Sequence, residues 1–295
     1  EAKSGHPTTS LSAVELMTTL FFGGFLKSDL NHPKGVQSLN NDRVVFSKGH
    51  ATPLLYSLYH AAGVLSYKKL MTLRKINSEL EGHPVPRFKY VDVATGSLGQ
   101  GLSIGVGMAL GIKLKIKSNK LKVKREPKVW VLLGDSEISE GQVWEAIQLA
   151  SYYKLNNLIG ILDVNRLGQR GQTMLGWDLI TYKKRFEAFG WNVITVEDGH
   201  DLKKIYDAYV ETQNFASLQK PTIILAKTIK GKGVSFLENK DGWHGKPVPK
   251  DMLEGALKEL GKVDLKVRGT IKKPNFQFSP DLIGIQSISN DQILN

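Results

Sequence analysis

Two apolar runs that each end in an oxygen-bearing side chain dominate the middle of this chain. Val129–Leu133 is followed by Gly-Asp135, and Leu158–Val164 is followed by Asn165, with a helix-like segment between the two runs. In a right-handed strand–helix–strand unit, both strand tips reach the same edge of a parallel sheet, where open α/β folds bind ligands. A carboxylate and an amide oxygen at that edge suit a hard divalent cation, and such a cation suits a diphosphate.

The alternation of apolar patterns over the rest of the chain predicts an α/β fold. We expect a doubly wound parallel sheet with helices on both faces, because strands alternate with helices. Gly101, Gly105, Gly107 and Gly111 lie on or near one face of the predicted helix 98–117, and glycine is unfavourable in a helix unless backbones pack closely. The expected helices are 11–26, 50–63, 66–77, 98–117, 181–189 and 201–214, and the further strands are 192–196 and 222–228.

The composition is that of an ordinary globular protein of 295 residues, with a net charge of +12 and no cysteine. The lack of cysteine excludes disulfides and thiolate chemistry, and a cytoplasmic protein is the simplest expectation. No apolar run reaches the length of about 18 residues that a membrane span needs. Because no aromatic residues interleave with the lysines of 113–128, we expect a solvated surface there and neither a nucleic-acid nor a membrane partner. The chain does not begin with methionine, so we expect residues upstream.

A glycine-rich turn at residues 95–101 precedes the helix 98–117. Leu102 stands where a phosphate-binding loop needs lysine, and the third glycine is at 105 where a dinucleotide fingerprint needs one at 104. Neither standard nucleotide motif is therefore present. The turn serves either close packing or the contact of backbone amides with an anion or heterocycle.

The histidines are unusual because four of the seven lie next to glycine in loops: His6, His50, His83 and His244. Glycine beside histidine leaves room for a ligand near the backbone, and histidine carries protons near neutral pH. Each of the four is therefore a candidate for lining a site, although a lone histidine is more often structural.

Two glutamates, Glu140 and Glu145, lie near the start of the helix that follows Asp135. Glu140 in the first turn has a simple role in complementing the helix dipole. The alternative is a buried carboxylate that relays protons near the metal site.

Taken together, these motifs resemble those of a known protein family. The pairing of Gly-Asp135 with Asn165 resembles the thiamine-diphosphate motif, and further motifs resemble those of transketolases, most of all the animal-type branch. The resemblance runs from residue 2 to about residue 260 and rests on eight motifs in order. These motifs are the Gly-Asp and Asn pair together with SGHPTT, SKGHATPLLY, EGHPVP, ATGSLGQGLS, EISEGQVWEA, NRLGQ and WHGKPVPK, and the wording of RFEAFGW and WHGKP is closest to the animal-type branch.

The resemblance implies thiamine diphosphate, a metal ion (Mg²⁺ or Ca²⁺) and a set of site residues. The implied metal ligands are the side chains of Asp135 and Asn165 and the carbonyl of Leu167. The implied catalytic residues are His6, His83, His244 and Glu140. The implied cofactor-binding residues are Thr9, His50, Gly96, Ser97, Leu98, Asp135, Ser136, Glu145, Asn165, Lys230 and His244, with Glu145 supporting a carboxylate relay.

Two departures from the family pattern bear on this assignment. Ser136 stands where the family has a second glycine, so the diphosphate contact survives only if the backbone at 136 does not need a positive φ. The chain also lacks the pyrimidine-binding domain that activates the cofactor, so we expect residues 1–261 to form the diphosphate-binding domain and 262–295 to form an extended tail or linker.

The resemblance therefore implies one half of a transketolase. The reaction would transfer a two-carbon ketol unit between sugar phosphates in the pentose phosphate pathway. The pyrimidine-binding domain would belong either to a separate subunit or to a longer form of this chain; we favour a partner subunit, which would assemble as an α₂β₂ heterotetramer. Two alternatives are half of another thiamine-diphosphate enzyme, such as deoxyxylulose-phosphate synthase, and a catalytically silent regulatory subunit.

Overall fold

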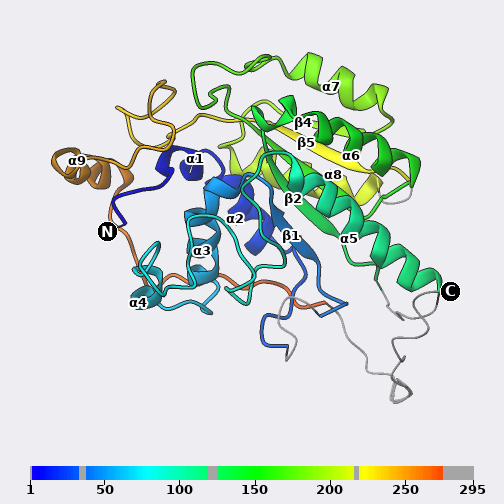
Figure 1. Ribbon diagram of the computed structural model, residues 1–295, viewed down its shortest axis with the longest axis horizontal. Helices are drawn as coiled ribbons and strands as arrows, with labels where there is room; N and C mark the ends of the chain where they lie inside the picture. Colours follow the sequence, from blue (N-terminus) through cyan, green and yellow to red (C-terminus); the bar gives the residue numbers. More distant parts are fainter. Residues whose placement is uncertain (1, 33–37, 119–124, 216–218, 275–295) are drawn as a thin grey trace.

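The computed structural model describes residues 2–32, 38–118, 125–215 and 219–274, and within them a single parallel sheet forms the centre (Figure 1). The strand order is β1-β2-β3-β5-β4, and every pairing is parallel. The predicted doubly wound α/β fold is confirmed. The strands are β1 (Arg43–Phe46), β2 (Val129–Gly134), β3 (Leu158–Val164), β4 (Asn192–Val196) and β5 (Thr222–Lys227).

Helices cover both faces of this sheet. Helices α2, α3 and α8 contribute to one core cluster, and α5, α6 and α7 contribute to the other. The helices are α1 (Pro7–Leu11), α2 (Val14–Phe22), α3 (Thr52–Ala61), α4 (Tyr67–Leu70), α5 (Gln100–Lys117), α6 (Gly141–Tyr152), α7 (Leu179–Ala188), α8 (Leu202–Asn214) and α9 (Lys250–Leu260), with 3-10 turns at Gly49–Ala51 and Glu137–Ser139.

Strand β2 is apolar along its whole length because both of its faces are buried. Trp130 and Leu132 belong to the core on the α2–α3–α8 side, while Val131 and Leu133 belong to the core on the other side. Successive side chains of a strand point to opposite faces, so a strand covered on both faces is apolar at every position. The same alternation holds for β3, with the exception of one buried charge discussed below.

The glycines of α5 have two different environments, so the prediction of close packing for all four is half right. A Cβ added at Gly101 would lie 2.4 Å from Ser47 Cβ, and one added at Gly105 would lie 2.6 Å from Val131 Cγ2. Gly107 and Gly111 have no such neighbour within 4 Å among the described residues. The first two glycines therefore bring α5 close to the sheet, whereas the other two do not.

Several predicted elements differ from the structure. The predicted helix 66–77 is helical only over Tyr67–Leu70, because Arg74 and Asn77 have positive φ values of 61° and 66°. The predicted helix 11–26 is shorter, ending at Phe22 before two glycines. Strand β1 and helix α9 were not predicted: β1 is only four residues long, and α9 follows a long irregular segment.

Part of the predicted tail packs against the domain. Gly269 N donates to Ala61 O at 2.9 Å, Ser28 N donates to Lys272 O at 2.9 Å, and Ile271 is 7% exposed. Residues 275–295 lie outside the described residues, and the boundary at 261 stays a prediction. A helix with the length and apolarity for crossing a membrane is absent from the described ranges.

Candidate functional site

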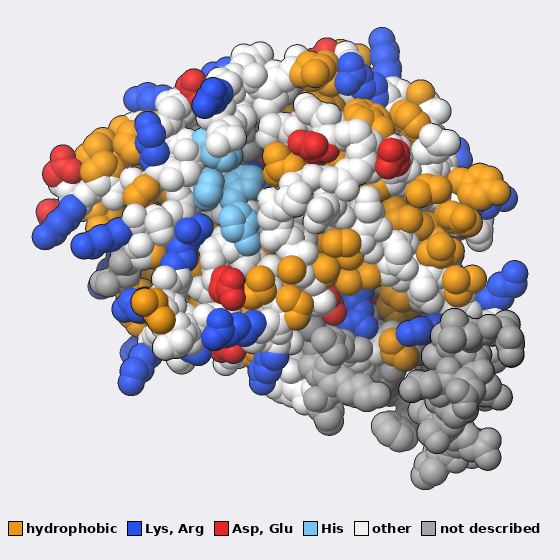
Figure 2. Space-filling view, viewed as in Figure 1, with side chains coloured by type: hydrophobic (Ala, Val, Ile, Leu, Met, Phe, Trp, Pro, Cys, Tyr) orange, Lys and Arg blue, Asp and Glu red, His pale blue; other side chains and the backbone are white. Residues whose placement is uncertain are grey.

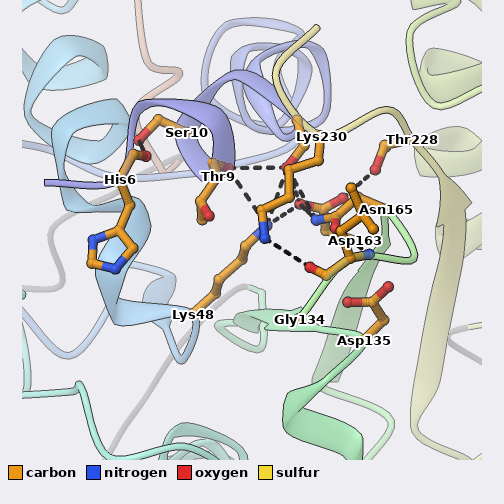
Figure 3. Close-up of polar contacts among 12 residues, drawn as sticks. His6, Thr9, Ser10, Lys48, Gly134, Asp135, Asp163, Asn165, Thr228 and Lys230 are labelled. Carbon is orange, nitrogen blue, oxygen red and sulfur yellow. Dashed lines mark hydrogen bonds and ion pairs between the residues drawn. The ribbon is translucent and has the colours of Figure 1, made fainter. Parts of the chain in front are cut away.

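The carboxyl ends of β2, β3 and β5 meet at one edge of the sheet, and a small pocket lies above them (Figure 3). Gly134 pairs in register with Asp163, so the residues that follow β2 and β3 leave the sheet side by side. The prediction that Asp135 and Asn165 share an edge is confirmed. The pocket is lined by Thr9, Lys48, His50, Leu98, Gly134, Asp135, Ser136, Glu137, Asn165, Leu167, Lys230 and His244.

Asp135 is a buried carboxylate, 4% exposed, without an ion-pair partner in the described part of the chain. Its Oδ1 accepts from Ser136 N at 2.9 Å and its Oδ2 accepts from Arg166 N at 2.6 Å. Burial, followed by the charge of Asp163, raises the pKa of Asp135 to about 6. A buried negative charge in this position is stabilised by a cation, so the side chain fits a metal ligand.

The turn after β3 presents the other two candidate metal ligands. Asn165 Oδ1 accepts from Leu167 N at 3.2 Å, and Leu167 O accepts from Lys230 Nζ at 2.8 Å. A carbonyl oxygen has two lone pairs, so the lysine leaves one free for another partner. Arg166 has a positive φ of 63°, and its Nε donates to Asn239 Oδ1 at 2.7 Å, which anchors this unusual conformation.

Serine at position 136 is compatible with a contact to a phosphate group. Its φ is −70°, so the backbone does not need the glycine that the family pattern has there. The condition that we set for the diphosphate contact is therefore met. Ser136 also lines the pocket, next to Asp135.

A buried ion pair that the sequence analysis missed forms the floor of the site. Lys48, 3% exposed at its side chain, pairs with the fully buried Asp163, and Ser12 and Thr228 donate hydroxyl hydrogen bonds to the same carboxylate. Burial acts to raise the pKa of Asp163, but the charge of Lys48 and these hydrogen bonds outweigh it and lower the pKa. A charged residue in an otherwise apolar buried strand was the available signal, because such a residue needs a partner.

Lys230 is a second buried cation in the site, and unlike Lys48 it has no carboxylate partner among the described residues. Its Nζ lies 2.8 Å from His244 Nδ1, and no carboxylate is within ion-pair distance among the described residues. Burial, followed by the charge of Lys48, lowers the pKa of Lys230 to about 8. The buried Thr9 Oγ1 has no hydrogen-bond partner in the same part of the chain. An unpaired cation beside an unpartnered hydroxyl fits an anionic, oxygen-rich ligand such as a diphosphate.

The predicted histidines form a cluster beside this pocket, and Figure 2 shows histidine side chains gathered in a hollow of one face. The ring centroids of His6, His50 and His244 lie 4.9 to 5.1 Å apart. His83 is near His6, on which its charge acts, and its ring would lie 3.1 Å from a Cβ added at Gly96. Burial, followed by neighbouring positive charge, lowers the pKa of His6 and His244 to about 4. Both rings are therefore neutral at pH 7, and His6 is able to accept a proton.

The glycine turn before α5 lies at the same edge. Leu98 lines the pocket and Ser97 is exposed, while Gly96 and Gly99 have positive φ values of 150° and 85°. A Cβ added at Gly49 would be 3.0 Å from Gly96 N, so close packing accounts for part of this turn. The proposed contact of Gly96, Ser97 and Leu98 with a ligand stays a prediction.

The two predicted glutamates are not in the pocket. Glu140 and Glu145 are exposed on and beside α6, so the structure does not bring Glu145 to the cofactor-binding residues. The buried carboxylate of this region is Glu137, which is 1% exposed. It accepts from Gly99 N at 2.7 Å and from Gly134 N at 3.1 Å, and so ties the glycine turn to the tip of β2. A relay through Glu140 stays a prediction that needs a second chain.

The two ends of the domain meet over the site. Gly231 N donates to Thr8 O at 3.0 Å, and Thr8 Oγ1 donates to Trp243 O at 3.3 Å, across 235 residues of sequence. These bonds hold α1, which carries Thr9, against the segment that carries Lys230 and His244. The pocket is therefore built from both ends of the domain.

The chain is similar to known proteins over most of its length. Residues 1–271 match the family described as "Transketolase, thiamine diphosphate binding domain". The chain is 47% identical to the human transketolase, over 88% of this chain and 39% of that protein. It is 43% identical to mouse transketolase-like protein 2, over 98% of this chain and 43% of that protein.

Solved transketolase structures have the same fold. That of Campylobacter jejuni superposes with a TM-score of 0.77 at 34% identity, covering 94% of this chain and 41% of that one. That of Leishmania mexicana superposes with a TM-score of 0.79 at 29% identity, covering 94% and 40%. The chain spans about two fifths of the length of the relatives it matches. It belongs to the transketolase family, and the part of the family that it contains is the thiamine diphosphate binding domain.

Proposed function

We propose that this chain is the diphosphate- and metal-binding half of a transketolase. The observation that carries the proposal is the meeting of Asp135, Asn165, the unpaired Lys230 and a neutral histidine cluster at one sheet edge. The reaction would move a two-carbon ketol unit from a ketose phosphate to an aldose phosphate. Neither sugar preference nor the choice between Mg²⁺ and Ca²⁺ is part of the proposal.

The residues that would hold the cofactor follow from the pocket. Asp135, the side chain of Asn165 and the carbonyl of Leu167 would bind the metal, since all three offer oxygen atoms. Lys230 and Thr9 would bind the diphosphate, together with His50 and the amide of Ser136. When bound, thiamine diphosphate supplies the electron sink that stabilises the two-carbon carbanion.

The histidines would handle protons and hydroxyl groups. His6 is neutral at pH 7 and would accept hydrogen bonds or protons from the hydroxyls of the donor sugar, whereas His244 would donate a hydrogen bond to them. Lys230 donates to His244 Nδ1, which leaves the other ring nitrogen as the proton-bearing one. His83 would contact the same substrate from beside the glycine turn.

A second chain is part of this proposal. The partner would supply the pyrimidine-binding domain and close the open side of the pocket, so that the cofactor lies at a subunit boundary. We propose an α₂β₂ assembly, because pairing of two symmetric halves gives each cofactor the same surroundings. The exposed Glu140 and Glu145 would then be available for a relay between chains.

Complementation is the direct test of the activity. We expect this chain, co-expressed with a chain that carries the pyrimidine-binding domain, to transfer a ketol unit from xylulose 5-phosphate to ribose 5-phosphate when thiamine diphosphate and Mg²⁺ are present. Each chain alone should be inactive. If the assembled pair binds the cofactor but shows no transfer, the chain is a silent regulatory subunit and the proposal is wrong.

His200 should affect cofactor binding although it lies outside the pocket. Its Nδ1 is 3.0 Å from Glu15 Oε2, and its Nε2 accepts from Ile229 N at 2.8 Å, directly before Lys230. Replacing His200 by alanine removes the acceptor for this amide, which we expect to weaken binding of thiamine diphosphate about tenfold by loosening Lys230. Calorimetric titration with Mg²⁺ present measures the change.

A matched control separates this effect from general destabilisation. The exposed Lys203 is close in sequence, and K203A should leave the affinity unchanged. E15Q keeps the shape of the pair but not its charge, and should give an intermediate loss. Full affinity in a folded H200A variant would show that Lys230 is held without this contact.

A further inference from the structure

A second polar cavity lies at the opposite end of the sheet, where β1 and β2 begin. It has a volume of about 190 Å³ and is lined by Lys27, Arg125, Lys128 and Trp130, among others. Lys128 directly precedes β2, and its carbonyl accepts from Arg43 N at 2.8 Å. Strand β2 is six residues long, so this cavity and the pocket beyond Gly134 are about 20 Å apart.

Positive charge at this cavity exceeds negative charge. Lys27, Arg125 and Lys128 line it and Lys272 is close to Lys27, whereas the carboxylate facing them is Asp42, 2% exposed. Asp42 already accepts from Arg125 Nη2 at 2.7 Å and from the backbone amides of Lys27 and Lys128. Burial, followed by the charge of Lys272, lowers the pKa of Lys27, and burial also lowers that of Lys128.

Two buried hydrogen-bond donors beside the cavity have no acceptor among the described residues. Trp130 is 1% exposed, and its indole Nε1 has no hydrogen-bond partner among the described residues. Arg125 Nε is likewise buried and unpartnered within that part of the chain. Lys128 Nζ lies 5.6 Å from the centre of the Trp130 ring and makes no ion pair with a described residue. Buried donors without acceptors are unfavourable, so an acceptor-rich ligand would stabilise this region.

A simpler role accounts for only part of this cluster. Lys27 Nζ donates to Gly24 O, just past the end of α2, where a cation complements the helix dipole. That role does not use Lys128 or the free donors of Arg125 and Trp130. The basic run at 113–128, which we expected to be only solvated surface, therefore contributes its last residues to a partly enclosed cavity.

We propose that this cavity binds a doubly charged tetrahedral oxyanion, either inorganic phosphate or the terminal group of a phosphate monoester. Such an anion offers several acceptor oxygens to the guanidinium, the ammonium and the indole N–H at once, and relieves the repulsion among the cations. The site is independent of the cofactor pocket. Its presence or absence therefore leaves the proposed ketol transfer untouched.

The indole N–H of Trp130 allows a local test. In protein labelled with ¹⁵N-tryptophan, the five indole signals are resolved by NMR, and the W130F variant identifies that of Trp130. Titration with sodium phosphate, against sodium chloride of equal ionic strength, should shift this signal saturably with millimolar or tighter affinity. A second titration with glycerol 3-phosphate separates the sources: a matching shift indicates a site open to monoesters, and a shift with inorganic phosphate alone indicates a site for the free anion.

Charge-matched variants complete the test. R125Q/K128Q should weaken phosphate binding at least tenfold, while K115Q/K117Q, which removes equal charge from exposed lysines of the same basic run, should not. If the first pair does not fold, K128Q alone should still weaken binding severalfold. Absence of a saturable shift up to 20 mM phosphate, or an equal affinity in both double variants, would overturn the proposal.

Discussion

Replacing Asp135 by asparagine should abolish the metal-dependent binding of thiamine diphosphate. The substitution keeps the size of the side chain and one oxygen atom but removes the buried negative charge that would hold a divalent cation. Without the metal, the diphosphate would keep Lys230 and the uncharged groups of Thr9, His50 and Ser136 but lose the divalent charge. We expect the dissociation constant to rise at least 100-fold, equivalent to about 3 kcal/mol. Titration calorimetry with and without Mg²⁺ measures it.

Stability gives the control for this experiment. Since burial and Asp163 raise the pKa of Asp135 to about 6, the ionised carboxylate is unfavourable in the chain without ligands. D135N removes this charge but also replaces one of the two oxygens that accept backbone amides with an NH₂ group, so its free energy of unfolding should change little, in contrast to its loss of affinity. D207N, at an exposed aspartate of α8, should change neither property. An unchanged metal dependence in D135N would remove Asp135 from the ligand set.

Replacing Gly101 by alanine should destabilise the fold strongly. The new Cβ would lie 2.4 Å from the side chain of Ser47 and 2.6 Å from its Cα, so α5 and the end of β1 must move apart. Overpacking of this kind lowers the free energy of unfolding by about 3 kcal/mol. Ser47 also bonds Glu137, which holds Gly99 and the tip of β2, so the shift reaches the site. Urea denaturation measures the loss.

Gly107 on the same helix is the matched control. It is exposed and a Cβ added there meets no described atom within 4 Å, so alanine at 107 relieves only the low helix propensity of glycine. G107A should be more stable by up to about 1 kcal/mol. Equal effects of G101A and G107A would mean that the helix does not pack against Ser47 as closely as the structure indicates.

The parts of the fold and site that follow from sequence are those set by local pattern. Continuous apolar runs bounded by Asp135 and Asn165 predict parallel strands and a shared edge, because the crossover rule leaves one arrangement. The four glycine-flanked histidines lie at or beside the same pocket for a related reason. His50 and His244 lie in segments that follow β1 and β5, where ligands can approach the backbone, whereas His6 and His83 reach the same place from loops beside helices.

The remaining features depend on contacts between distant residues. The pairing of Lys48 with Asp163 joins the end of β1 to the interior of β3, and no local pattern encodes the distance between them. Glu137 was passed over in favour of Glu140, because sequence spacing does not show which of two neighbouring carboxylates turns inward. Strand β1 was missed since its four residues give too short a pattern.

The bonds from Thr8 to Gly231 and Trp243 have a consequence for how the chain acquires its site during synthesis. A ribosome makes α1 more than two hundred residues before the segment around His244, so α1 lacks its partner for that contact while the residues between them are synthesised. The pocket is completed only when this last stretch has emerged and closed over the first helix. Cofactor binding therefore reports that the whole domain has folded, and removal of the first ten residues should damage the site as much as a change at its centre.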